Sequence, residues 1–262
     1  MRKYRLGKLP ARPARLRFAD FLTPQELPPI PMSFGHDRGI AWGMLGNGPD
    51  GNPAHIPVGC CAETGAEHET MLWATEARKP VVFDYVSTVA NYSAITGYDP
   101  RQTDANGDNP TDQGTDIQQA AEYRRTTGIL DAHGNRHRIA AYVALTPGNL
   151  HELYAAAYLF GAVGIGLELP DTAEEQFDNL RPWTPVPGAQ IDGGHYVSVV
   201  GRRDHTIRVV TWGREQVMTE AFYVAYNDES FVYLSEEMLI DGRTVDGVDL
   251  AALRSELKAL AA

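Results

Sequence analysis

The sequence predicts an α+β fold in which a helical half precedes an antiparallel sheet. Helical patterns dominate before about residue 130, and strand patterns dominate after it. The strand-like segments 193–201 and 206–213 flank the short turn "RRDH", which is typical of a hairpin. We therefore expect a cleft between the two halves, where a helix from one half meets a strand from the other.

The chain divides by composition into three parts. Residues 1–40 are proline-rich and predict an extended basic arm, residues 41–240 predict the main domain, and residues 241–262 predict a closing amphipathic helix. Prolines prevent a helix in the arm, and its leucines and Tyr4 need a surface to cover. We expect the arm to dock on its own domain or on a partner, with a solvated tail as the alternative.

The main domain is expected to begin with a turn-rich loop at 46–59 and a helix at 61–76. The further elements expected in chain order are helices at 79–100, 116–129 and 149–161 and strands at 135–145, 162–170, 193–201, 206–213 and 230–235.

The net charge of −11 conceals an opposition between the arm and the rest of the chain. Residues 1–17 carry seven basic side chains and no acid, so removing +7 from −11 leaves −18 for the remainder. An acidic domain argues against nucleic-acid binding except through the arm. No apolar run could span a bilayer, and the N-terminus lacks the apolar core of a secretory signal.

The two cysteines, Cys60 and Cys61, are adjacent and stand where a helix is expected to begin. They cannot join distant segments, which favours a reducing compartment. A helix N-terminus lowers the pKa of a thiol, and a nucleophilic thiol also needs a base within reach. His68 shares the helix face of Cys61 but lies roughly 10 Å further along the axis, so packing or a buried hydrogen bond is its expected role.

His195 is the best candidate for that base. It opens a strand behind Gly193 and Gly194, in "DGGHYVSVVG", and glycines there let another backbone or a substrate approach closely. An ordinary histidine at the start of a strand is the alternative.

A cysteine at a helix start, followed by "HYVSVVG" and "VVTWG" hairpin strands, resembles the papain-like cysteine peptidases. The segments "NPTDQGTDIQQAAEYRRTTGI", "NLHELYAAAYLFGAVGIGLEL" and "ESFVYLS" resemble that family's helices and strands in the same order, over roughly residues 42–235. The whole chain is similar to uncharacterised papain-like proteins of actinobacterial phages and prophages, through "WGMLGN", "HETMLW" and "VVTWG".

The resemblance implies a papain-like fold and assigns a role to each site residue. Cys61 would be the nucleophile, since its distance to "HETMLW" matches the phage relatives, and His195 the general base. Asn47 would stand at the oxyanion position, and Trp212 would shield the partner of His195. Val210 falls where the family has its histidine-orienting Asn, which leaves Thr211 as the polar neighbour of His195.

Whether Thr211 can reach His195 depends on the register of the hairpin. If Gly201 pairs with Thr206, His195 faces Trp212 and Thr211 points to the other side of the sheet, and a slip of one residue reverses this. Glu63 and Glu67 near Cys61 are expected to raise the thiol pKa.

Two functions follow from these observations. The first is a papain-like thiol hydrolase of the phage type, acting on peptide or amide bonds or else weak or inactive, with a peptide or protein substrate and no cofactor or metal. The alternative is a non-catalytic virion or assembly protein that binds other phage structural proteins through residues 1–30. Both imply the cytoplasm of a bacterial host or a phage virion as the location, without membrane insertion.

Overall fold

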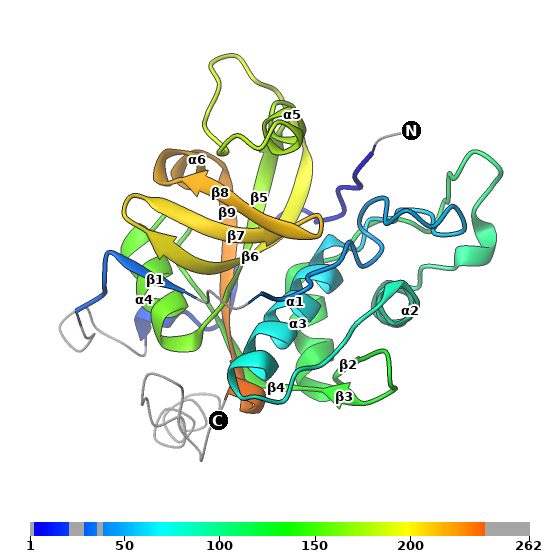
Figure 1. The fold of residues 1–262 in the computed structure, drawn as a ribbon, viewed down its shortest axis with the longest axis horizontal. Coiled ribbons are helices and arrows are strands. Elements are labelled where there is room, and N and C mark those ends of the chain that lie inside the picture. Colours follow the sequence, from blue (N-terminus) through cyan, green and yellow to red (C-terminus); the bar gives the residue numbers. More distant parts are fainter. Residues whose placement is uncertain (1–2, 21–28, 36–38, 239–262) are drawn as a thin grey trace.

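The computed structural model describes residues 3–20, 29–35 and 39–238, and it has the predicted α+β architecture. Figure 1 shows the helices α1, α2 and α3 on one side of the molecule and the main sheet on the other. Among the described residues, no helix is long and apolar enough to cross a membrane.

The helical half contains α1 (Cys61–Glu76), α2 (Tyr85–Thr96) and α3 (Ile117–Thr126). Local sequence signals define their ends. Asp84 caps α2 by accepting from Ser87 N at 2.8 Å, and Gly97 ends it in the left-handed region at φ 83°. A small hairpin, β2 (Ile129–Leu130) and β3 (Arg136–His137), follows α3.

The sheet half contains seven antiparallel strands in the order β4-β9-β5-β6-β7-β8, with β1 paired to the outer part of β6. Its elements are β1 (Ser33–Gly35), β4 (Ile139–Ala144), α4 (Leu150–Phe160), β5 (Val163–Pro170), α5 (Ala173–Asp178), β6 (Ile191–Arg203), β7 (Thr206–Thr211), β8 (Arg214–Thr219), α6 (Glu220–Tyr226) and β9 (Asn227–Ser235). Short 3-10 helices lie at Phe18–Asp20, Pro100–Gln102 and Glu236–Met238.

The predicted elements at 61–76, 116–129, 149–161, 162–170, 193–201, 206–213 and 230–235 are confirmed as α1, α3, α4, β5, β6, β7 and β9. The strands β1, β2 and β8 and the short helices α5 and α6 were not predicted, and β1 and β2, with three and two residues, are too short to show a periodic pattern. The expected helix at 241–262 lies outside the described residues.

Helix α1 crosses the sheet at β6 and is buried on all sides from Cys61 to Ala74. Gly65 makes close contact possible, since a Cβ there would overlap the ring of Tyr196 on β6. Glu69 then joins the two elements by accepting from Tyr196 Oη at 2.6 Å and Ser198 Oγ at 3.2 Å. A hydrogen-bonded network of this kind fixes the helix that begins at Cys61 against the strand that carries His195.

The N-terminal arm lies on the domain throughout residues 3–20. Its basic side chains pair with the acidic body: Lys3 Nζ lies 2.7 Å from Asp178, and Arg12 Nη2 lies 2.9 Å from Asp116. The backbone continues along β4, where Leu16 O accepts from Ala144 N at 2.9 Å. Residues 3–20 therefore dock on their own domain, which is one of the expected alternatives for the arm.

Candidate active site

Cys61 is the first residue of α1 and lies at the junction of the helical and sheet halves. Cys60 is the N-cap residue, and its side chain caps no amide of the helix. Helices α2, α3 and α4 are instead capped by Asp84, Asp116 and Asn149. The α1 N-terminus is therefore left without a capping carboxylate or amide beside the thiol.

In this structure Cys61 is a buried thiol and not a thiolate. Burial, together with the smaller effect of Glu63, raises its pKa to about 12, although the backbone amides of Tyr196 and Gly7 and the charge of Lys8 act to lower it. The expectation that the helix N-terminus would depress the thiol pKa is wrong for this structure. Desolvation of a charge exceeds the helix-dipole contribution when the sulfur has no access to water.

His195 lies on β6 and is fully buried. Its Nε2 is 2.8 Å from Thr211 Oγ1, its ring stacks on Trp212 with centroids 4.8 Å apart, and its Nδ1 is buried without a partner among the described residues. Burial lowers the pKa of His195 to about 3, so the imidazole is neutral. The amide of Tyr196, which follows His195, stabilises the charged form of Cys61, so the thiol and the histidine lie on facing segments.

A β-bulge decides which residue meets His195. Pairing of β6 with β7 shifts register between Val199 and Gly201, so that Gly201 pairs with Arg208 and Ser198 with Val210. The extra residue changes the side of the sheet to which later residues point. As a result Thr211 lies on the same face as His195 and bonds it, while Trp212, which follows the end of β7 with φ 45°, stacks on the imidazole.

Asn47 is buried in the loop that precedes α1. Its Nδ2 donates to Arg5 O at 2.8 Å and to Val58 O at 3.3 Å, and its backbone oxygen accepts from Arg5 N at 3.3 Å. A carbonyl oxygen of the arm is therefore bound to the amide predicted to stabilise an oxyanion.

The arm runs directly across the predicted site. Tyr4 stacks on Trp212 with centroids 4.3 Å apart and an interplanar angle of 14°, and its hydroxyl donates to Asp178 at 2.9 Å. The next residue, Arg5, accepts a hydrogen bond from Asn47 Nδ2 through its carbonyl oxygen. The arm thus contacts the aromatic ring beside His195 and the predicted oxyanion donor within two residues.

Gly7 and Lys8 cover the thiol. The Gly7 amide faces Cys61 and stabilises the charged form of the thiol, while Gly7 O accepts from Thr115 N at 2.7 Å. Lys8 N donates to Gly194 O at 3.0 Å, directly before His195. The arm is hydrogen-bonded to Thr115 before α3 on one side and to Gly194 of β6 on the other.

Glycines line the path of the arm and explain why a backbone fits there. Any side chain in place of these glycines would crowd the arm, because its Cβ would lie unusually close to an arm atom. The glycines concerned are Gly48, Gly59, Gly114, Gly166, Gly193 and Gly194. The expected role of the glycines before His195 is confirmed, since Gly193 contacts Leu6 and Gly194 contacts Lys8.

The remaining thiol and helix histidine have structural surroundings. Cys60 Sγ lies 3.5 Å from Leu45 O, and burial raises its pKa well above the ordinary value. His68 Nε2 lies 3.0 Å from Trp42 O and 3.2 Å from Gly43 O. The predicted buried hydrogen bond of His68 is confirmed. The described residues contain no cluster of three or more potential metal ligands.

Comparison with solved structures identifies the fold of this chain. No family model and no curated protein matches the sequence. Among solved structures the chain is similar to xylellain, a cysteine protease from Xylella fastidiosa, with a TM-score of 0.66 and 13% identity over 89% of this chain and 97% of that chain. It is also similar to digestive procathepsin L 3 from the larval midgut of Tenebrio molitor, with a TM-score of 0.57 and 12% identity over 88% of this chain and 76% of that chain. The chain therefore has the papain-like cysteine protease fold.

Sequence reasoning did not find the residues through which the arm binds. Gly7 is the arm residue that fits over Cys61, and Lys8 enters a pocket made by Asp228 and Glu229. The available signal was a glycine between Leu6 and Lys8 in an otherwise basic and proline-rich segment, which is too weak to place the arm on a particular surface.

Proposed function

We propose that this chain is a papain-like thiol hydrolase of peptide or amide bonds, with its site covered by its own N-terminal arm. One observation supports this most strongly: a single short segment, residues 4–8, lies over Trp212, Asn47, Cys61 and the residue before His195 in succession. An extended peptide therefore fits the cleft along which the proposed catalytic groups are arranged.

The proposed chemistry uses the free nitrogen of His195. When Nε2–H donates to Thr211, Nδ1 is the unprotonated nitrogen and takes the proton of the Cys61 thiol. The thiolate attacks a carbonyl carbon, and Asn47 Nδ2 donates to the oxyanion that forms. The amine leaves with the proton from His195. Water, deprotonated by His195, then hydrolyses the thioester, which releases a carboxylic acid and restores the thiol.

The arm itself is not presented for cleavage. Over the sulfur it places the N–H of Gly7, and the Gly7 carbonyl points to Thr115 N. The arm also forms a parallel bridge between Lys8 and Thr115. A nucleophile needs a carbonyl carbon and not an amide hydrogen. The arm therefore covers the thiol without being cleaved by it.

Gly7→Val tests the proposal in the full-length chain, because a Cβ at Gly7 would overlap the carbonyl of Gly59 and force the arm out. We expect this variant to hydrolyse fluorescein-labelled casein, and the double variant Gly7→Val/Cys61→Ala to lose that hydrolysis. Casein left intact by a folded Gly7→Val chain whose Cys61 is open to alkylation would contradict the proposal.

Thr211 is proposed as a positioning residue for His195. In the Gly7→Val chain, Thr211→Val is expected to lower kcat roughly 3- to 10-fold, the value of one buried hydrogen bond, while Thr211→Ser retains the hydroxyl and most of the rate. Steady-state kinetics with one peptide substrate measures both. If the serine variant loses as much as the valine variant, the methyl group matters and the hydrogen bond does not.

A second function is favoured by the closed site. A thiol with a pKa of about 12 and a histidine with a pKa of about 3 form no ion pair, and Val210 stands where the resemblance places the histidine-orienting Asn. Such a domain also suits a non-catalytic assembly protein of the phage type, attached by its basic arm. Lack of hydrolysis by the opened chain, with loss of partner binding when the arm is displaced, supports this second function.

A further inference from the structure

Helix α1 binds the chain that leads to Asn47 through two side chains one turn apart. Thr64 Oγ1 donates to Leu45 O at 3.0 Å, and His68 Nε2 lies 3.0 Å from Trp42 O. Residues four apart share a helix face, and both side chains are buried. The backbone before Asn47 is therefore fastened to one face of α1, and the catalytic proposal gives neither bond a role.

The turn that carries Asn47 has a conformation that its sequence disfavours. Asn47 N donates to Met44 O at 3.0 Å, which closes the turn. Its two central residues have positive φ, 45° at Leu45 and 83° at Gly46. Two positive φ values are typical of a type I′ turn, which favours Gly, Asn and Asp. Leucine is strained in this region, and such a conformation persists only where the surrounding contacts hold it.

The contacts that hold Leu45 come from the start of α1. Its carbonyl oxygen accepts from Thr64 Oγ1 at 3.0 Å and from Cys60 Sγ at 3.5 Å. A thiol is a weak donor, so the hydroxyl supplies the stronger of these two bonds. Leu45 is buried, and loss of the hydroxyl would leave its carbonyl with the weak donor. Thr64 therefore fastens the strained residue of the turn to the helix that begins at Cys61.

The same turn is joined to the segment that enters α1, across the inserted loop 48–57. Val58 N donates to Gly46 O at 2.8 Å, and Val58 O accepts from Asn47 Nδ2 at 3.3 Å. Asn47 is thus bonded to a residue three positions before Cys61. The position of its amide relative to the thiol depends on how firmly the turn is held.

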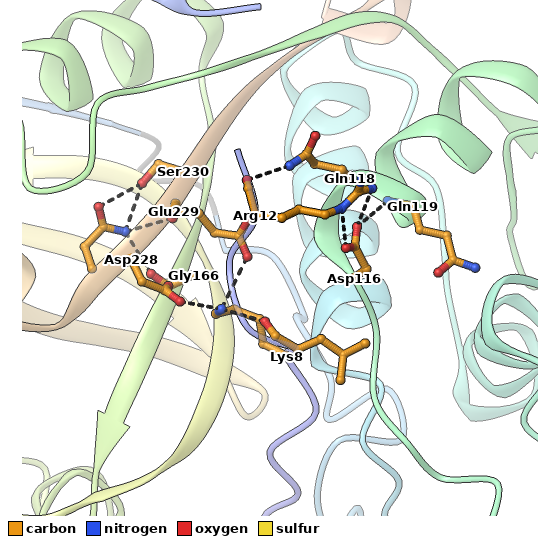
Figure 2. Close-up of polar contacts among 11 residues, drawn as sticks. Lys8, Arg12, Asp116, Gln118, Gln119, Gly166, Asp228, Glu229 and Ser230 are labelled. Atoms are coloured by element: carbon orange, nitrogen blue, oxygen red, sulfur yellow. Dashed lines mark hydrogen bonds and ion pairs between the residues drawn. The ribbon is translucent and has the colours of Figure 1, made fainter. Parts of the chain in front are cut away.

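The arm also contacts the turn, but only through backbone atoms of Arg5. Arg5 N donates to Asn47 O at 3.3 Å, and Arg5 O accepts from Asn47 Nδ2 at 2.8 Å. The side chains of Lys8 and Arg12 pair instead with carboxylates of β9 and of the N-cap of α3, as Figure 2 shows. When the arm is displaced, its two bonds to Asn47 are lost and the bond from Thr64 remains.

We propose that Thr64 is a positioning residue for the Asn47 amide, because it clamps the turn Met44–Asn47 to the first turn of α1. This inference rests on the proposed hydrolase function, in which Asn47 Nδ2 donates to the oxyanion. A donor that is already in place stabilises the transition state without reorganisation, and misplacement by about 1 Å can cost roughly 100-fold in rate. The Thr64 hydroxyl thus acts on catalysis through Asn47.

A double-mutant cycle in the full-length Gly7→Val chain tests this, with steady-state kinetics on one peptide substrate. Thr64→Val should lower kcat roughly 10- to 100-fold with little change in KM, and Thr64→Ser should retain most of the rate. Thr64→Ala also removes the hydroxyl, without placing a methyl group against Leu45 O, and should act like Thr64→Val. Asn47→Ala should lower kcat by roughly 100-fold, and adding Thr64→Val to it should cost only about twofold more.

Two controls separate positioning from a general structural role. Thr70→Val removes another buried hydroxyl of α1, one that donates to Ala66 O at 2.8 Å within the helix, and should keep kcat. Alkylation of Cys61 by iodoacetamide forms no oxyanion, so Thr64→Val should leave that rate within about twofold. Losses of kcat that multiply in the double variant, or a matching fall in the alkylation rate, would overturn the role of Thr64.

Hydrogen exchange separates this inference from the function beneath it. In the same Gly7→Val background, Thr64→Val should accelerate exchange of the Asn47 amide by roughly tenfold, and Thr70→Val should not. Mass spectrometry of a peptide spanning residues 42–49 measures the rate. Faster exchange with no hydrolysis by any variant keeps the clamp and overturns the hydrolase. Unchanged exchange overturns the clamp, whether or not the chain hydrolyses peptides.

Discussion

Gly7→Val is expected to increase the alkylation rate of Cys61 by roughly three orders of magnitude at pH 8. A thiol with a pKa of about 12 is ionised in roughly one molecule in 10⁴ at this pH, whereas an ordinary thiol with a pKa of about 8.5 is ionised in roughly one in four. Displacing the arm restores water to the sulfur and removes the burial that raises the pKa. Displacing the arm also removes the steric barrier to the alkylating reagent, so the true rate increase should exceed the increase that follows from ionisation alone.

Iodoacetamide labelling followed by mass spectrometry measures this rate for each cysteine. Cys60 lies beneath Leu45 and is expected to stay unreactive in both chains, which provides an internal control. Gly39→Val is the matched control for the substitution, since no atom lies within 4 Å of a Cβ there. Unchanged labelling of Cys61 in a folded Gly7→Val chain would show that the arm does not cover the thiol.

His195 should determine where the opened thiol titrates. In the Gly7→Val chain, His195→Ala is expected to raise the pH midpoint of Cys61 labelling, because the thiolate loses the group that would carry the compensating charge. An equal midpoint with and without the imidazole would mean that Cys61 and His195 do not act together.

The elements that carry the site could be predicted because each has a local signal. The spacing of Cys61, Gly65, His68 and Leu72 predicts one helix face, and the structure has α1 over residues 61–76. The glycines before His195 predict the close approach of another backbone. These signals depend on neighbours in sequence, which is why they were visible without a structure.

The contacts across the cleft could not be predicted in the same way. The contact of Gly7 with Cys61 depends on how the two halves pack, and so does the ion pair of Lys8 with Glu229. The contact of Thr211 with His195 depends on one bulge near Gly201, and no residue in the strand predicts that bulge. Local patterns specify elements, whereas these contacts are consequences of the assembled fold.

The acidic side chains of α1 illustrate the same limit. Glu63 and Glu67 were expected near the thiol, but both are also buried, at 1% and 0% exposure. Burial raises the pKa of Glu67 well above its ordinary value, and it accepts from Thr88 Oγ1 and from Asn91 Nδ2 at 2.9 Å. Glu69 has a cation instead, with Arg124 Nη1 at 2.7 Å. A carboxylate's neighbours in space, and not its place on the helix, decide its charge.

Glu63→Gln is expected to stabilise the protein at pH 8 by about 3 kcal/mol and to have little effect at pH 4.5. Burial raises the pKa of Glu63 from 4.5 to about 7, which at about 1.4 kcal/mol per unit gives this figure. Because the folded-state pKa is the higher one, the stability due to the protonated carboxyl is present below pH 4.5 and is lost as the pH rises through 7. Glutamine keeps an oxygen for the Thr115 hydroxyl, which lies 2.9 Å from Glu63 Oε1, and it has no charge to bury.

Urea unfolding of the parent chain and of Glu63→Gln at both pH values measures the difference, with Glu168→Gln as an exposed control. The variant has a second expected effect, since ionised Glu63 also raises the pKa of Cys61. In the Gly7→Val background, Glu63→Gln should therefore move the Cys61 labelling midpoint to lower pH. Equal stabilities at pH 8 would show that Glu63 is solvated or paired in solution. A stability gain without a shift of the thiol midpoint would show that its charge does not reach the sulfur once the arm has left.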